Sequence, residues 1–233
     1  MDAIVLAAGK GTRLRPLTND TPKPLLTVQG RPILERTLLG LDGVADRVIV
    51  VVKYLKEQII AYMEQQDIFK DYEIVEQLPE PLGTGHAVQC CQPLLTSDEF
   101  IVMNGDDLYD PVALWGMKEQ GAAIMAALRD DAPKWGVIVS TEDQKFVRIH
   151  EKPEAGLYPP PVYVNIGVYK LTRQIFDYDI QKSSRGEYEI TDYVNYLSQQ
   201  VPIKVIRTDF WVPIGTPQDL EQAQTITLPT VGK

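Results

Sequence analysis

The sequence AIVLAAGKGTRLRP, residues 3–16, is the most informative segment of the chain. Its apolar first part predicts a short buried strand over residues 3–7. Two glycines and the cations Lys10, Arg13 and Arg15 follow this strand directly. In an open α/β sheet, ligands bind at the carboxyl ends of the strands, and glycines let backbone N–H groups approach phosphate oxygens. The segment therefore predicts a strand that ends in an anion-binding loop, with a flexible βα turn as the alternative.

The rest of the chain alternates between β-rich runs and helical patterns. In the first half, strands are expected over residues 47–53, 73–76 and 100–103, and helices over 33–41, 55–65 and 84–95. After a helix over 112–118, strands are expected over 124–128, 137–140, 146–150, 162–171 and 203–207, with helices over 173–178 and 189–199 and a last helix capped by Thr216. Such alternation is typical of βαβ units. We predict a single α/β domain, residues 1–233, with a Rossmann-like three-layer fold, a predominantly parallel mixed sheet and a smaller strand-rich lobe.

The composition disfavours several classes of protein. The 233 residues carry 23 Lys and Arg against 32 Asp and Glu, a formal net charge of −9, which argues against binding to nucleic acid or to an anionic membrane. No apolar run approaches the roughly 18 residues of a membrane-spanning helix, and the N-terminal sequence lacks the pattern of a secretory signal. Cys90 and Cys91 are adjacent, which suits neither a disulfide framework nor a metal site. We therefore expect a cytoplasmic protein with no nucleic-acid or membrane partner.

Several short motifs occur in an order that resembles one enzyme family. GKGTRLRPLT at residues 9–18 is followed by TPKPLL at 21–26, LGTGHA at 82–87, NGDD at 104–107, WGV at 135–137, EKP at 151–153, NIG at 165–167 and WVPIGT at 211–216. Together they resemble the sugar-1-phosphate nucleotidylyltransferases over nearly the whole chain, most of all the thymidylyl- and uridylyltransferases that act on glucose-1-phosphate. The resemblance implies a nucleotide-binding part at about residues 1–110 and a sugar-binding part at about residues 111–225.

The resemblance implies transfer of a nucleotidyl group from a nucleoside triphosphate, UTP or dTTP in the first place, to a sugar-1-phosphate, with release of pyrophosphate. Such an in-line displacement needs neutralised charge and aligned phosphates but no protein nucleophile. By resemblance, Arg13 stabilises the leaving pyrophosphate, Lys23 lies between the two reacting phosphates, and Asp106 holds Mg²⁺. The structural alternatives are a solvated Lys23 and a turn in which Asp107 caps the next segment.

Two further sets of residues are implied for the two substrates. They are Ala8, Gly9, Gly11, Thr12, Gln77, Gly83 and Thr84 for the nucleotide, and Gly136, Glu151, Lys152 and Asn165 for the sugar phosphate. The amide of Gln77 can pair with a pyrimidine edge, and an ordinary polar loop residue is the alternative. Neighbours on a strand face opposite ways, so Glu151 and Lys152 reach one ligand only if the backbone bends. We interpret His86 as a residue that is structural or weakly lines the ligand site, not as a catalytic base. Trp211 is interpreted as a packed aromatic, with a place in the wall of the site as the alternative.

Pro213 departs from the family pattern. Family members usually carry an Asp two residues after the Trp of the last motif, where it completes the Mg²⁺ site. Asp209 lies roughly 13 Å from that place on an extended strand, and Asp107 supplies a second carboxylate only if its loop turns. The departure leaves two rivals open: a catalytically weak regulatory subunit that binds a nucleotide sugar, and a nucleotidyltransferase for another phosphorylated alcohol such as phosphocholine. Homo-oligomer formation is also left open.

Overall fold

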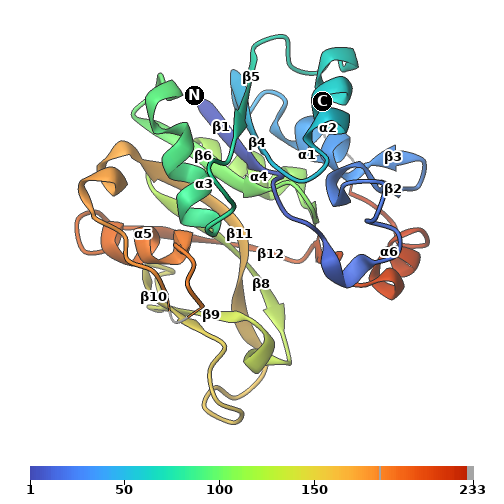
Figure 1. The fold of residues 1–233 in the computed structure, drawn as a ribbon. Helices are drawn as coiled ribbons and strands as arrows, with labels where there is room; N and C mark the ends of the chain where they lie inside the picture. The colour runs from blue at the N-terminus through green and yellow to red at the C-terminus, as the bar shows by residue number, and fades with distance from the viewer. Residues whose placement is uncertain (184, 230–233) are drawn as a thin grey trace.

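The computed structural model describes residues 1–183 and 185–229, and within them one nine-stranded mixed sheet runs through the molecule (Figure 1). Its parallel core consists of β1 (Asp2–Leu6), β4 (Arg47–Val52), β5 (Tyr72–Glu76) and β6 (Glu99–Asn104). In space these strands lie in the order β5, β4, β1, β6, so the winding of the chain reverses between β1 and β6. Ligands of open α/β sheets bind at such a reversal, outside the carboxyl ends of the strands. A ligand is therefore expected beside the residues that follow β1 and β6.

Helices cover both faces of this sheet. The helices on the sheet are α1 (Ile33–Leu41), α2 (Lys56–Gln65), α3 (Thr84–Cys91), α4 (Pro111–Lys118) and α5 (Ile190–Leu197), whereas α6 (Pro217–Ala223) packs in a separate apolar cluster. Apolar residues of α1, α2 and α4 pack on one face of the sheet, and those of α3 and α5 pack on the other. Successive strand residues alternate between the faces, and Ile49 and Val50 accordingly belong to different cores. The predicted Rossmann-like three-layer fold is confirmed.

The second half of the chain continues the same sheet. Its strands are β8 (Ala123–Arg129), β9 (Gly136–Ser140), β10 (Phe146–Glu151), β11 (Val162–Thr172) and β12 (Lys204–Thr208), and short strands elsewhere are β2 (Thr27–Val28), β3 (Arg31–Pro32), β7 (Leu108–Tyr109) and β13 (Trp211–Val212). The long β11 joins the halves, because its end pairs with β6 and its beginning pairs with β8 and β9. Figure 1 shows β8, β9 and β10 extending away from the parallel core as a strand-rich lobe.

Most predicted elements are present with shifted ends. The helix predicted over 84–95 ends at Cys91 and continues as a 3₁₀ turn over Gln92–Leu94, because Pro93 lacks the N–H that an α-helix needs. The helix predicted over 173–178 is a 3₁₀ helix over Arg173–Asp177. The last helix begins as predicted, with the Thr216 side chain accepting from the Asp219 N–H. Across the described ranges, no helix combines the length and apolar character of a membrane span.

A third apolar cluster ties the C-terminal part of the chain to the loop after β1. Leu14 and Ile33 pack with Ile214 and with Ala223 of α6. Helix α6 also lies beside the β2–β3 hairpin (Figure 1), where the Gln224 side chain donates to the Thr27 carbonyl at 2.9 Å. Segments from the two ends of the chain are therefore held together next to the β1 loop.

Candidate active site

The loop after β1 contains a position that glycine fits best. Gly11 has a φ of 57°, in the left-handed region, and a Cβ there would lie 3.0 Å from Thr18 Cγ2 and 3.2 Å from Lys23 Cβ. The Thr18 hydroxyl donates to the Gly11 carbonyl at 2.8 Å, just before the 3₁₀ turn over Thr12–Leu14. The loop therefore has a defined shape, which a merely flexible turn would lack.

Lys23 is buried beside two carboxylates. It begins the 3₁₀ turn Lys23–Leu25, and its Nζ donates to Asp106 Oδ2 at 2.8 Å and to Asp107 Oδ1 at 3.4 Å. Burial alone would lower the pKa of the Lys23 ammonium, but the two carboxylates raise it above its usual value. The alternative of a solvated Lys23 is wrong, because only 7% of the residue is exposed. Lys23 is a fixed positive charge next to the end of β6.

The two aspartates after β6 have different surroundings. The Asp106 side chain is 37% exposed, whereas that of Asp107 is 12% exposed. Asp107 accepts from the Trp211 indole N–H at 3.2 Å and from the Ile214 backbone N–H at 2.9 Å. Burial and the neighbouring Asp106 raise the pKa of Asp107 to about 6, although Lys23 and the Ile214 N–H oppose the shift. Asp106 is thus accessible to a ligand, while Asp107 is committed to the protein.

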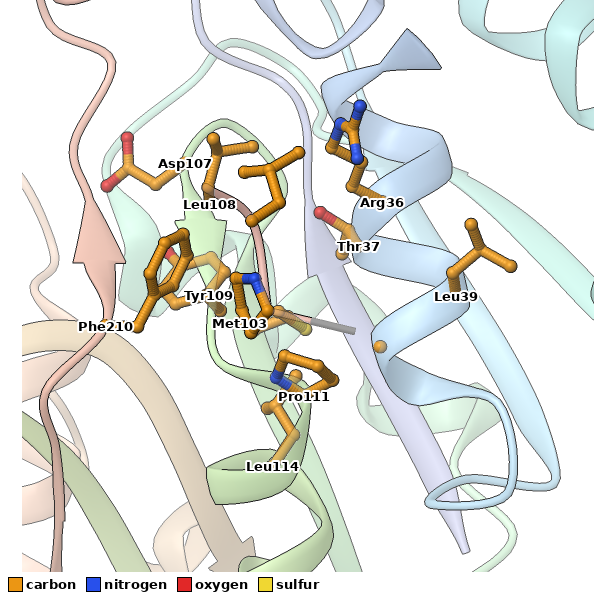
Figure 2. Close-up of a pocket in the computed structure, with 13 residues that line it drawn as sticks. Arg36, Thr37, Leu39, Met103, Asp107, Leu108, Tyr109, Pro111, Leu114 and Phe210 are labelled. Atoms are coloured by element: carbon orange, nitrogen blue, oxygen red, sulfur yellow. The ribbon is translucent and has the colours of Figure 1, made fainter. Parts of the chain in front are cut away.

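Asp107 holds the C-terminal segment in place instead of capping a helix. The prediction that it caps the next segment is wrong, because Asp110 caps α4 and accepts from the Val112 N–H at 2.9 Å. Asp107, Leu108 and Phe210 help to line a further cavity between α1, β7 and α4, and Figure 2 shows the Asp107 carboxylate pointing away from α1. The hydrogen bonds of Asp107 to Trp211 and Ile214 therefore attach the segment around β13 to the turn that follows β6.

Three cavities adjoin at the carboxyl ends of β1 and β6. The first is lined by Gly11, Thr12, Arg13, Lys23, Asp106 and Gly215. The second is lined by Ala8, Gly9, Gln77, Gly83, Thr84 and Asp106, among others. The third is lined by Asn104, Asp107, Trp135, Glu151, Asn165 and Trp211, among others. Asp106 borders the first two cavities, and Thr84 and Asn104 border both the second and the third. Residues from distant parts of the sequence thus surround one continuous cleft.

Gln77 forms part of the wall of the second cavity. It follows β5 and is 2% exposed. Its Nε2 donates to the Gly83 carbonyl at 2.9 Å and lies 3.2 Å from His86 Nδ1. Gly83 adopts a φ of 99°, a conformation that residues with a side chain rarely reach. Gln77 is therefore a buried residue with fixed partners at the wall of this cavity.

The segment before α5 closes over the same wall. The Gly85 N–H donates to the Tyr188 carbonyl at 2.8 Å, and the Tyr188 N–H donates to the Leu82 carbonyl at 2.7 Å. Thr84 Oγ1 accepts from the Ile190 N–H at 3.1 Å. Thr84 thus joins the starts of α3 and α5 while it borders both the second and the third cavity.

Gly136 and Glu151 face each other across β9 and β10. They are partners in the strand register, and a Cβ at Gly136 would lie 2.9 Å from Glu151 Oε1. Glycine at this position leaves room for the carboxylate, whose pKa is raised by desolvation in the cleft. Lys152 has a φ of 43°, so the backbone does bend after Glu151. Lys152 is nevertheless exposed and lies outside the described lining of the third cavity.

The Asn165 amide already has partners within β11. Its Nδ2 donates to the Tyr169 hydroxyl at 2.8 Å, and its Oδ1 accepts from the Gly167 N–H at 3.0 Å. Gly167 has a φ of 77°, and a Cβ there would lie 2.1 Å from Asn104 Nδ2. The Asn104 side chain therefore packs directly on the backbone of β11. Any residue other than glycine at position 167 would place its Cβ in the space that Asn104 occupies.

Two tryptophans form another wall of the third cavity. The rings of Trp135 and Trp211 meet edge to face at 5.0 Å. The Arg129 guanidinium lies 4.6 Å from the centre of the Trp211 ring and donates to the Trp211 carbonyl at 2.8 Å. Trp211 is 6% exposed, so it is a packed aromatic that also borders the cleft.

Asn104 and Glu189 are among the cleft residues that sequence reasoning missed. Asn104 borders two cavities and directly precedes Gly105 and Asp106, so its place at the end of a predicted strand was the available signal. Glu189 lines the third cavity and accepts from Arg185 Nη2 at 2.7 Å. No local pattern marks Glu189, because the fold alone brings the start of α5 to this cleft.

Asp106 is the residue that fits a divalent cation. Among residues 1–183 and 185–229, no group of three or more His, Cys, Asp and Glu is arranged to hold a metal ion. Both oxygens of Asp107 accept hydrogen bonds from the segment that contains Pro213, and Pro213 has no side-chain oxygen. Mg²⁺ commonly uses one or two carboxylates together with waters and substrate phosphates. A part-exposed carboxylate beside a cavity with Arg13 and Lys23 suits a cation held chiefly by phosphate oxygens.

The sheet, the glycine loop and the adjoining cavities define a Rossmann-like α/β protein with a cleft at the strand-order reversal. The chain belongs to the nucleotidyl transferase family, whose model matches residues 2–229. The resemblance to the sugar-1-phosphate nucleotidylyltransferases is thereby confirmed.

Relatives with stated activities support this membership. The UTP–glucose-1-phosphate uridylyltransferase AglF of Haloferax volcanii is 36% identical over 96% of this chain and 95% of its own length. The bifunctional protein GlmU of Methanococcus aeolicus is 37% identical over 99% of this chain but only 55% of its own length. The chain thus spans about half the length of the GlmU relatives. A UDP-glucose pyrophosphorylase solved with UDP-glucose has a TM-score of 0.85 at 21% identity over 96% of both chains, and so it shares the fold.

Proposed function

We propose that this protein transfers a uridylyl or thymidylyl group from UTP or dTTP to a sugar-1-phosphate, producing a nucleotide sugar and pyrophosphate. The observation that carries the proposal is a cleft of three adjoining cavities: Asp106 borders the first two, Thr84 and Asn104 connect the second to the third, and the buried cation Lys23 lies beside Asp106. Two anionic substrates can lie end to end in such a cleft. The name of the AglF relative, a UTP–glucose-1-phosphate uridylyltransferase, agrees with this substrate class.

The reaction is an in-line displacement at the α-phosphorus. An oxygen of the sugar phosphate forms a bond to this phosphorus, and the bond from the phosphorus to the oxygen that bridges to the β-phosphate breaks. Pyrophosphate leaves with the electron pair. Gly9 and Gly11 leave the backbone open to the triphosphate, Thr12 adds a hydroxyl, and Arg13 balances the charge of the leaving group.

Lys23 is the cation between the two reacting phosphates in this scheme. In the ligand-free protein it is neutralised by Asp106 and Asp107. Phosphate oxygens compete with Asp106 for the ammonium when the substrates bind, and Lys23 then reduces the repulsion between the two anions. The turn between two prolines limits the places that the Lys23 backbone can take.

Asp106 would hold Mg²⁺ through the carboxylate oxygen that does not bind Lys23. When bound, a divalent cation neutralises phosphate oxygens and increases the electrophilic character of the phosphorus. Asp107 does not share this task, because its hydrogen bonds keep Trp211 and Ile214 in place.

The remaining residues recognise the two ends of the product. Ala8, Gln77, Gly83 and Thr84 border the space for the nucleoside. Glu151 and Asn165 border the space for the sugar, and Gly136 leaves room for the Glu151 carboxylate. Lys152 would have to swing inward to pair with the phosphate of the sugar. These assignments divide the chain into a nucleotide part at about residues 1–110 and a sugar part at about residues 111–225.

A screen for pyrophosphate release tests the proposal. Purified protein is incubated with Mg²⁺ and each of UTP, dTTP, CTP, ATP and GTP against a panel of sugar-1-phosphates, with phosphocholine as a non-sugar acceptor. We expect release with UTP or dTTP and at least one sugar-1-phosphate. Turnover with phosphocholine alone would instead identify a different phosphorylated alcohol as the acceptor.

Pro213 favours a second candidate, a regulatory subunit that binds a nucleotide sugar without turning it over. The metal site lacks one carboxylate of the family pattern, and Asp107 does not replace it. Binding of UDP-glucose or dTDP-glucose, measured by calorimetry, in a protein that releases no pyrophosphate with any substrate pair would support this candidate over the enzyme.

A further inference from the structure

The amide of Gln77 has a determined orientation. The Gly83 carbonyl oxygen, 2.9 Å away, can only accept a hydrogen bond, so the facing atom of Gln77 must be the NH₂ group. The same nitrogen lies 3.2 Å from His86 Nδ1. The two protons of the amide are thus directed at Gly83 and His86, and Oε1 is the atom of this amide left for a ligand in the second cavity.

The contact with Gln77 also determines the state of His86. Because Nδ1 faces an amide donor, it must carry a lone pair, and the imidazole proton must be on Nε2. His86 Nε2 lies 3.8 Å from Cys90 Sγ, one turn further along α3, and sulfur can accept weakly from this N–H. Burial lowers the pKa of His86, which favours the neutral ring. The imidazole is therefore an acceptor toward Gln77.

We propose that His86 is a positioning residue for base selection: by accepting from Gln77 Nε2, it keeps the Gln77 carbonyl oxygen turned toward the nucleobase. This inference rests on the proposed function. A pyrimidine that carries a proton on N3, uracil or thymine, can donate to this oxygen. Cytosine presents a lone pair at N3, which the same oxygen repels.

Gly83 alone would hold this orientation by a single hydrogen bond instead of two. Without an acceptor at residue 86, the Gln77 amide can rotate by giving up the one hydrogen bond from its NH₂ group to the Gly83 carbonyl, and the NH₂ group then reaches the base. An amide that can rotate presents its oxygen to the N3 proton of uracil in one orientation and its NH₂ group to the N3 lone pair of cytosine in the other. Discrimination between UTP and CTP therefore falls. His86 thus acts on the base through Gln77 and makes no bond to the ligand itself.

The state of His86 is measurable without turnover. The chain contains two histidines, His86 and His150, so long-range ¹H–¹⁵N NMR spectra of the ligand-free protein are simple to assign with a His150→Gln variant. We expect His86 to be the neutral form with its proton on Nε2 at pH 7.5. A proton on Nδ1, or on both nitrogens, would overturn the proposal whatever the protein catalyses.

A double-mutant cycle tests whether His86 acts through Gln77. The Kd values for UTP and CTP are measured in the wild type, His86→Ala, Gln77→Ala and the double variant. We expect His86→Ala to reduce the preference for UTP by about tenfold, and to change it no further in the Gln77→Ala background. His86→Asn, whose side-chain oxygen can accept in place of Nδ1, should restore most of the preference.

The matched control is His150→Ala, which removes a histidine that contacts Tyr158 and should leave the UTP-to-CTP ratio unchanged. Equal weakening of UTP and CTP by His86→Ala, with the ratio intact, would overturn the proposal in favour of a purely structural His86. Failure of the wild type to bind any nucleoside triphosphate would overturn the proposed function as well, while the NMR result would still report the state of His86.

Discussion

Two carboxylate sites at opposite ends of the parallel sheet behave in opposite ways. At the amino end of β1, Asp2 is 2% exposed and accepts from the Thr96 N–H at 2.6 Å and from the Ser97 N–H at 3.2 Å. Burial alone would raise the pKa of Asp2, but these hydrogen bonds outweigh it and the pKa is lowered. At the carboxyl end of β6, burial and Asp106 raise the pKa of Asp107 to about 6.

The two sites differ in how well the charge of each carboxylate is balanced: Asp2 is fully hydrogen-bonded within the fold, whereas Asp106 and Asp107 belong to the proposed ligand site. The Asp2 carboxylate accepts hydrogen bonds from Thr96 and Ser97, and these donors stabilise its negative charge. Asp106 and Asp107 share one cation, Lys23, and repel each other. Such unfavourable arrangements are typical of sites that gain their missing partners when substrates bind.

The largest effect on turnover is expected from substitutions at the carboxyl end of β6. Lys23→Ala and Asp106→Asn should each lower turnover by about 10²-fold or more, the scale for losing one group that stabilises charge in the transition state. Pyrophosphate release measures the rate, and thermal denaturation measures the fold. Lys145→Ala, which removes an exposed lysine of the β9–β10 turn, is the control and should retain wild-type turnover. Rates near that of the wild type in either site variant would remove that residue from the mechanism.

At the amino end, the same kind of change should affect stability and not chemistry. Asp2→Asn should lower the free energy of unfolding at pH 7 by about 1–3 kcal/mol, because buried N–H donors lose a charged acceptor. Turnover per folded molecule should stay within about twofold of the wild type, since Asp2 lies far from the cleft at the other end of the strand. Urea denaturation gives the free energies of unfolding. Asp67→Asn, at an exposed carboxylate, is the control and should leave the free energy of unfolding unchanged.

The stability difference between the wild type and Asp2→Asn should depend on pH in a defined direction. The pKa of Asp2 is lower in the folded protein than in the unfolded chain, so its contribution is present above the unfolded value of about 4 and is lost as the pH falls through the folded value. The stability gap between the wild type and Asp2→Asn should therefore narrow between pH 5 and pH 3. A gap that stays constant over this range would show that ionisation of Asp2 contributes nothing.

The smallest effect is expected at Pro213, where an Asp would add a carboxylate to the proposed Mg²⁺ site. Pro213→Asp should lower the Mg²⁺ concentration for half-maximal turnover by about threefold to tenfold, because a second anionic oxygen strengthens a hard-cation site. Pro213→Ala separates the added charge from the loss of the proline ring and should give no such shift. Superimposable Mg²⁺ titrations for Pro213→Asp and an active wild type would show that the backbone here directs an Asp away from the phosphates. Activity in Pro213→Asp alone would favour the regulatory-subunit candidate.

Much of the architecture follows from local patterns. The apolar run over β1 and the alternation of helices and strands specify a parallel core, since burial on both faces requires such runs. Gly11 was recognisable as the glycine of a tight loop after β1, because a left-handed backbone conformation selects glycine at short range. Lys23 and Asp106 were predicted from motifs, and the structure brings them to 2.8 Å from each other.

Contacts between distant residues account for the rest. The direction of the Asp107 side chain depends on Trp211, 104 positions away, so local spacing suggested a helix cap that the fold does not form. Asn104 reaches the cleft only because β11 presents a glycine against it. Gln77 was identifiable as a candidate, but the orientation of its amide depends on which acceptors the folded chain places around it. Sequence periodicity encodes which faces are buried, whereas hydrogen-bond partners of single side chains arise from packing, because they require two backbone segments to meet within about 3 Å.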